Sequence, residues 1–161
     1  MNTKKTPIKR HPSLKPFSRD HHYGLLLGWK IREGFRRNVE LKRMKKYTDW
    51  FFVNHLKPHF EAEEKYMFPV LPEDNKLIKR AISEHRKLEK LFKDKDDIKR
   101  ALSLIEEKLD EHIRFEERTL FQEIQEIATE DQLQKIEEIH ETLPEDNWKD
   151  EFWKDEIKKS E

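Results

Sequence analysis

Apolar residues recur every three or four positions along most of the chain, which is the spacing that lets an α-helix bury one face. Leu25 and Trp29 show this spacing in the first such stretch, over residues 18–37. Ser18 is a suitable N-cap at its start, and Asn38 is a suitable break after its end. The pattern therefore predicts a first helix over 18–37.

Three more helices follow from the same spacing and from residues that stop helices. They cover residues 40–68, 74–92 and 94–128. Pro69 and Pro72 end the first of these three, and an acidic turn at 94–97 opens the last. Four long helices with short connections predict an all-α fold, namely an up-down-up-down antiparallel four-helix bundle.

The C-terminal part is predicted to add a short helical extension, with helices over 131–141 and 147–158. In the second of these, four apolar side chains share one helical stripe: Trp148, Phe152, Trp153 and Ile157. This stripe either packs on the bundle, or it docks a protein partner or a second copy of the chain.

Pro58 lies inside the second predicted helix. In a helix interior it removes one backbone hydrogen bond and clashes with the carbonyl of Asn54, at a cost of about 3 kcal/mol. Either the long helix tolerates a bend here, or the kink turns His59 inward.

The length of 161 residues fits one domain. We divide it into an irregular basic arm (1–17), the bundle (18–130) and a C-terminal extension packed on the bundle (131–161). Only 3 Gly occur, which favours helices over a turn-rich sheet. Charged residues make up 42% of the chain, but the 34 basic and 34 acidic residues cancel, as expected for helices with ion-paired outer faces.

Composition also argues against several classes of function. A net charge of zero gives no overall field for binding nucleic acid. No apolar run is long enough for a membrane span or a signal peptide, so we expect no membrane partner and a cytoplasmic location. The chain has no Cys, so any metal ion must be held by His and carboxylate side chains.

One motif occurs twice, since residues 59–68 and 112–121 both read H-x-x-x-E-E-x-x-x-F. Residues four apart share one face of a helix, so the His and the first Glu of each copy can reach one point. These pairs are His59 with Glu63 and His112 with Glu116. A single pair would mean little in a chain so rich in Glu, but the repetition indicates a metal site.

An acidic residue followed by His precedes each copy, at 20–21 and at 84–85. The halves 20–68 and 84–121 therefore read as two copies of one helix pair, which an approximate twofold would bring together at a binuclear site. Four buried imidazoles and two buried carboxylates are costly unless divalent cations satisfy them. The alternative is that these side chains lie on solvated helix faces.

Other chemistry lacks its motifs. Ferritin-like bundles need E-x-x-H on two helices, but this chain has it once, at Glu137 and His140. The H-E-x-x-H motif of zinc hydrolases does not occur, and no Ser has a base placed beside it by spacing.

Together these residues resemble the hemerythrin-like, or H-H-E cation-binding, family over about residues 18–130. The resemblance is carried by four motifs: D-H at 20–21, H-L-x-P-H-F-x-x-E-E at 55–64, E-H at 84–85 and H-I-x-x-E-E at 112–117. It implies an up-down bundle around a non-haem di-iron centre. Carried over by position, the terminal ligands would be His21, His59, His85 and His112, and the bridging carboxylates would be Glu63 and Glu116.

Several neighbouring residues keep alternatives open. His22 is a second choice for His21, which aligns better within the repeat. The family's oxygen carriers have a fifth histidine where this chain has Glu89, so either Glu89 or water takes its place. His55 is an extra ligand, a hydrogen-bond partner of a ligand, or a surface residue.

Four acidic residues next to the predicted ligands also need a role. Glu64 and Glu117 are expected to point outward and pair with Lys or Arg, whereas Asp20 and Glu84 can orient an imidazole.

The resemblance implies two iron ions, joined by an oxo or hydroxo bridge, that bind dioxygen, peroxide or nitric oxide, or that serve to store or sense iron. Manganese and zinc stay alternatives, because a site of His and carboxylate does not select one metal. Without the fifth histidine, peroxide or nitric oxide chemistry fits better than oxygen carriage. The second hypothesis is a helical interaction or sensor module in which the metal mainly stabilises the fold. Whether the protein is an enzyme stays open.

Overall fold

Long α-helices make up most of the computed structural model, which describes residues 9–139 and 147–155, and no β-strand occurs among them. The all-α prediction is therefore confirmed. None of the helices in these ranges is both long and apolar enough to cross a membrane.

Helix α1 spans Lys15–Arg36, so it begins before the predicted start at Ser18 and has no side-chain N-cap. A short 3₁₀ turn, Pro12–Leu14, leads into it. Pro16 lies in the first turn of α1, where a backbone N–H is not needed, so α1 extends into the range 1–17 that the sequence predicts to be an irregular arm. Phe17 is 1% exposed and anchors this end in the core.

Asn38 ends the first helical stretch as predicted, with a positive φ of 53°. The second stretch is a continuous helical run that is not α-helical throughout. It consists of α2 (Leu41–Phe51), a π-helical segment (Phe52–Leu56), α3 (Lys57–Ala62), a second π-helical segment (Glu63–Met67) and a 3₁₀ turn (Phe68–Val70). Pro58 lies in the first turn of α3 and has no backbone N–H to donate. The helical run accommodates it with a π turn just before it.

The third and fourth stretches begin at side-chain caps. Helix α4 (Lys76–Lys93) is capped by Asn75, and α5 (Ile98–Phe115) is capped by Asp97. A π-helical segment (Glu116–Leu120) joins α5 to α6 (Phe121–Ile127). The predicted bounds differ from these by a few residues, because the caps lie inside the polar connections.

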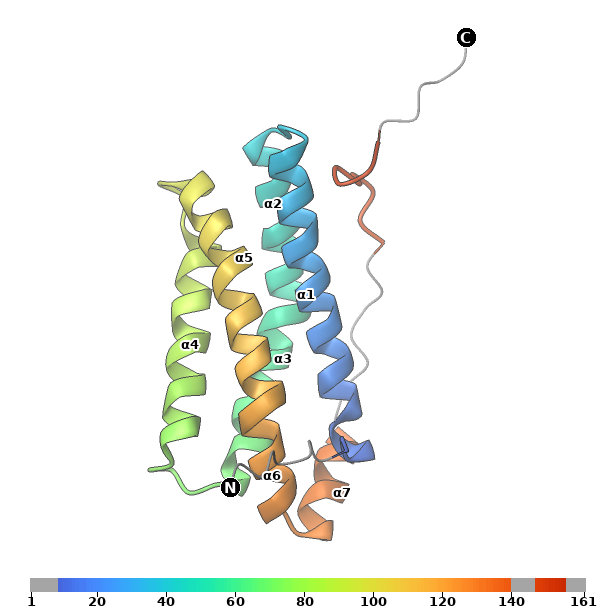
Figure 1. Ribbon diagram of the computed structural model, residues 1–161, viewed down its shortest axis with the longest axis vertical. Helices are drawn as coiled ribbons and strands as arrows, with labels where there is room; N and C mark the ends of the chain where they lie inside the picture. Colours follow the sequence, from blue (N-terminus) through green and yellow to red (C-terminus); the bar gives the residue numbers. More distant parts are fainter. Residues whose placement is uncertain (1–8, 140–146, 156–161) are drawn as a thin grey trace, which may run out of the picture.

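The four stretches lie side by side, as Figure 1 shows for α1, α2 with α3, α4, and α5 with α6. Their apolar side chains form two core clusters. On α1, His21 lies between Phe17 of one cluster and Leu27 of the other. A buried polar layer thus separates the two apolar clusters.

The C-terminal part holds α7 (Glu130–Ile139), close to the predicted helix over 131–141. The second predicted helix is wrong, because residues 147–155 are not helical; Ile157, His140 and Pro144 lie outside the described residues. Phe152 and Trp153 are both buried in the core, so they are covered by the chain itself and form no exposed docking stripe. Adjacent residues lie on different sides of a helix, whereas an irregular segment can bury both.

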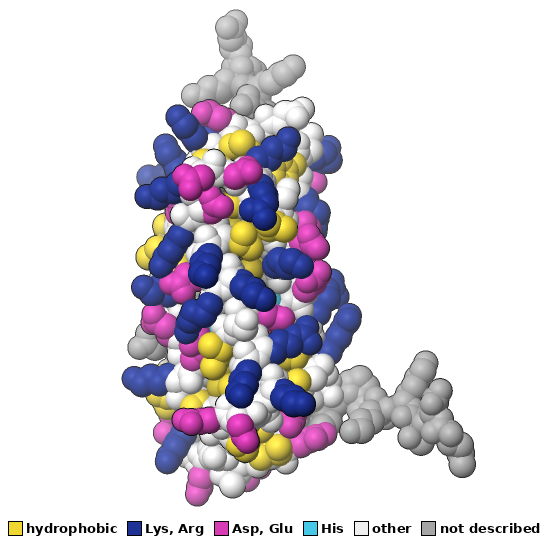
Figure 2. Space-filling model, turned by 90° about the vertical axis from the view of Figure 1, so that its left-hand side faces the viewer, with side chains coloured by type: hydrophobic (Ala, Val, Ile, Leu, Met, Phe, Trp, Pro, Cys, Tyr) yellow, Lys and Arg dark blue, Asp and Glu magenta, His cyan; other side chains and the backbone are white. Residues whose placement is uncertain are grey.

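The outer surface carries mixed charges, as predicted. Figure 2 shows Lys and Arg interspersed with Asp and Glu over one side of the molecule. Pairs such as Arg32 with Glu106, at 2.5 Å between Nη1 and Oε1, link neighbouring helices.

Candidate metal centre

Six side chains of the polar layer form two groups that could each hold a metal ion. They are His21, His59, Glu63, His85, His112 and Glu116. Each is 4% exposed or less. Within each group the candidate ligand atoms lie within 4.8 Å of one another, and both groups share the two carboxylates. The alternative of solvated faces is therefore wrong.

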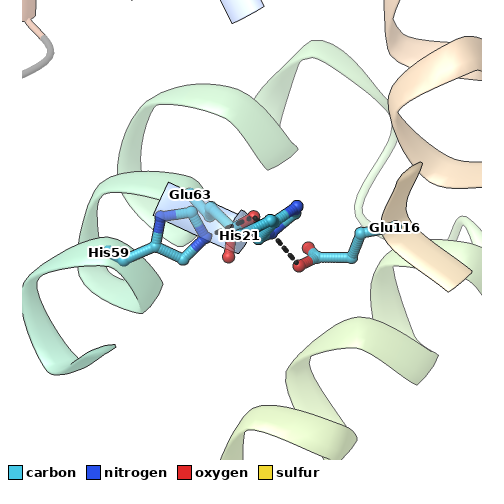
Figure 3. Close-up of side chains that lie close together, drawn as sticks. All are labelled: His21, His59, Glu63 and Glu116. Atoms are coloured by element: carbon cyan, nitrogen blue, oxygen red, sulfur yellow. Dashed lines mark hydrogen bonds and ion pairs between the residues drawn. The ribbon is translucent and has the colours of Figure 1, made fainter. Parts of the chain in front are cut away.

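Figure 3 shows the first group, which consists of His21, His59, Glu63 and Glu116. His21 comes from α1 and His59 from α3. The Nε2 atom of His21 lies 3.1 Å from Glu116 and 3.6 Å from Glu63. The Nε2 atom of His59 lies 3.2 Å from Glu63. Both rings thus direct the same nitrogen toward the shared carboxylates.

The second group repeats this arrangement with His85 from α4 and His112 from α5. The Nε2 atom of His85 lies 3.3 Å from Glu63. The Nε2 atom of His112 lies 2.9 Å from Glu116. Each carboxylate therefore faces at least one imidazole from each half of the chain.

The inner atoms of this layer fit metal ions. Although these distances are short, within the described part of the chain no hydrogen bond of suitable geometry is made by Nε2 of His59, His85 or His112, or by either Oε atom of Glu63. Buried polar atoms without partners are costly, and a divalent cation would satisfy these. Imidazole and carboxylate are suitable ligands for iron, manganese and zinc.

Each imidazole is also held at its other nitrogen, Nδ1, by a carboxylate outside the two groups. The pairs are His21 with Glu117 at 2.7 Å, His59 with Asp20 at 3.1 Å, His85 with Glu64 at 2.8 Å and His112 with Glu84 at 2.7 Å. Because a carboxylate only accepts, Nδ1–H donates, and in the neutral imidazole the lone pair of Nε2 then faces inward. Such bonds fix the orientation of metal-binding imidazoles and raise their basicity.

The expectation that Glu64 and Glu117 only point outward is wrong. Each does meet an arginine on its outer side, Arg86 for Glu64 and Arg10 for Glu117. Each also accepts the Nδ1–H of a buried imidazole on its inner side. Both follow directly after the first residue of a π-helical segment, where a wider turn separates successive side chains by a smaller angle than an α-helix does.

The Phe that ends each motif packs on an imidazole of the other half. The ring of Phe68 stacks on His85, with centroids 5.6 Å apart, and that of Phe121 stacks on His21 at 5.1 Å. In each copy, the N–H of the Phe donates to the carbonyl of the first Glu across the π turn. The second Glu and the Phe of one half therefore both position the first His of the other half.

Charge within the layer shifts the pKa values. Burial alone would lower the pKa of His59 and His112, but the carboxylates around them outweigh it and raise each pKa to about 9. Burial alone would raise the pKa of Glu63, but the neighbouring imidazoles hold it well below its usual value. Protons and metal ions thus compete for the same Nε2 atoms.

The remaining candidates lie outside both groups. His22 is exposed, unlike His21 beside it. Glu89 lies one turn after His85 but bonds the Nζ of Lys93 at 2.8 Å, so it does not take the place of the fifth histidine. His55 is not a surface residue, because it is 3% exposed and stacks on Phe51 with centroids 5.1 Å apart.

Comparison with protein-family models matches residues 18–124 to the hemerythrin HHE cation binding domain. The chain belongs to this family. Membership implies a metal-binding site, and the matched range of this hemerythrin-family chain contains both groups and all four outer carboxylates. No match was found among curated proteins or among solved structures.

Proposed function

We propose that this hemerythrin-family chain binds a pair of iron ions and, at them, a small ligand such as peroxide, nitric oxide or dioxygen, or that it senses or stores iron. Two imidazoles would hold each ion, His21 and His59 for one and His85 and His112 for the other. The four helical stretches would form the family's up-down-up-down bundle around the pair, which the colour order in Figure 1 supports.

The observation that carries this proposal is that both groups share Glu63 and Glu116. A site for one ion needs only one group, whereas two groups with common carboxylates suit two ions, both of which Glu63 and Glu116 would help to hold. When bound, an iron pair supplies exchange between the ferrous and ferric states and a coordination position for a small ligand.

The donor set favours some ligands over others. Because Glu89 faces outward to Lys93, each group offers two imidazoles of its own and the two shared carboxylates. This set lacks the fifth histidine that the family's oxygen carriers have. It supports peroxide or nitric oxide chemistry, or iron storage and sensing, over reversible oxygen carriage. The competing hypothesis is an interaction module that a partner recognises through the C-terminal aromatic side chains. It loses support, because Phe152 and Trp153 are buried.

Metal analysis of the purified chain tests the proposal. We expect two iron ions per chain after reconstitution with ferrous iron, and a visible charge-transfer band after oxidation. The Glu63→Gln variant should lose both signals, since it removes a carboxylate that the two groups share. One ion per chain, or none under excess ferrous iron, would overturn the proposal.

A further inference from the structure

A small cavity of about 10 Å³ lies beside the candidate centre. It is lined by His21, His59 and His112 among others, but not by His85. His85 is instead covered by Phe60, whose ring stacks on it with centroids 3.8 Å apart. The arrangement of ligands is nearly twofold, but its apolar surroundings are not.

Two positions of the internal repeat account for this difference. Ile113 follows His112 in the second copy of the motif, where Phe60 follows His59 in the first. The smaller of these two side chains, Ile113, therefore lies on the side of the centre that has the cavity. Gly24 follows His21 at the same distance as Leu88 follows His85. A Cβ at Gly24 would lie 2.7 Å from Cδ1 of Ile113, so any side chain there would press into the cavity wall.

His55 is the third departure from the repeat. Its equivalent is Lys108, whose side chain is 50% exposed, whereas His55 is 3% exposed and lines the cavity. Its ring lies between Phe51 and Trp50, with centroids 5.1 Å and 5.3 Å away. His55 belongs to the π-helical segment before Pro58, and α5 runs without a π turn through the equivalent position. Such segments often mark functional sites.

The roles of the two metal groups and of their outer carboxylates do not explain why the imidazole of His55 is buried beside them. Asp20 and the ligand imidazoles that line the cavity already have their roles in the layer. The rest of its lining is apolar apart from His55. A ligand in this cavity would therefore meet His55 as its polar contact outside the centre.

We propose that His55 is a ligand-binding residue, which hydrogen-bonds a small ligand held in this cavity at the candidate centre. This inference rests on the proposed function. The cavity is about the size of one water molecule, so only the end of a small ligand fits in it, and the imidazole favours an end of oxygen or nitrogen, as in peroxide, nitric oxide or azide.

Azide binding to the iron-loaded, oxidised protein tests this inference, with affinity measured by absorbance titration. His55→Leu keeps an apolar volume but removes the hydrogen bond, so azide should bind roughly tenfold to a hundredfold more weakly. His55→Gln retains an N–H donor and should restore part of the affinity. Lys108→Leu, at the equivalent exposed position, is the matched control and should leave affinity unchanged.

Ile113→Phe tests the cavity itself by copying the closed side of the centre. We expect it to retain two iron ions per chain and to lose azide binding. Full azide affinity in both His55→Leu and Ile113→Phe, with normal iron content and helix content by circular dichroism, would overturn this inference and leave the proposed function intact. A wild-type chain that takes up no iron would overturn both.

Discussion

At the scale of residues, each position that the two copies of the motif share has its own contact. The His and the first Glu of each copy enter the candidate centre, as in His59 and Glu63. The second Glu holds Nδ1 of a histidine in the other half, and the Phe packs on the same ring, as Glu64 and Phe68 do for His85. The motif therefore encodes both a site and its supports.

Three substitutions on one helical run separate these contacts. Glu63→Gln should abolish metal binding, because both groups lose a shared carboxylate. Glu64→Gln should weaken it by roughly tenfold to a hundredfold, since it only loosens His85. Glu61→Gln, at an exposed position, is the control. Competition with a chelator of known affinity measures all three, and equal loss in Glu61→Gln and Glu64→Gln would contradict the assignment.

At the scale of elements, π turns adapt two helical stretches to the centre. Two of them begin at Glu63 and Glu116 and bring the end of each motif into register with the opposite half. The third ends just before Pro58 and contains His55. Each inserts one extra residue per turn, which shifts the buried face relative to a regular α-helix.

Pro58→Ala tests how the chain accommodates its proline. Removing a proline from a regular helix interior should gain about 3 kcal/mol, but Pro58 lies in the first turn of α3 after a π turn. We therefore expect the free energy of unfolding in urea to change by less than about 1 kcal/mol. A gain near the full value would mean that Pro58 strains the helix.

The C-terminal segment should stabilise the fold without taking part in metal binding. Trp153 is 7% exposed and packs over Nζ of Lys30, which lies 4.0 Å from the ring centroid. Trp153→Ala should lower the free energy of unfolding by about 3 kcal/mol while metal content stays the same. Trp29→Ala, at a side chain 41% exposed, should cost much less. Loss of metal in Trp153→Ala would contradict this separation.

At the scale of the whole molecule, a buried layer of charge and imidazole divides the core into two apolar clusters. Burying this layer costs little free energy only where each charge and each lone pair has a partner. Metal ions that bind it bind the folded chain alone, because unfolding scatters ligands that come from all four helical stretches.

Metal removal should therefore lower the thermal stability of the whole chain. With metal at about 100 times its dissociation constant, the linkage amounts to about 2.7 kcal/mol per site. Thermal melts followed by circular dichroism, with and without a chelator, measure the shift. Glu63→Gln should melt at the same temperature in both conditions. A wild-type melting temperature that is the same with and without the chelator would argue that metal does not bind the folded state.

The sequence alone determined the four long helical stretches and the His and Glu pairs of the repeated motif, because helical period and the four-residue spacing of His59 and Glu63 are local properties. Only the tertiary structure decided which carboxylate meets which imidazole, since His21 and Glu117 come from opposite ends of the matched domain. It also decided the π turns and the irregular path of Phe152 and Trp153. Those features depend on packing between distant segments, which no local pattern records.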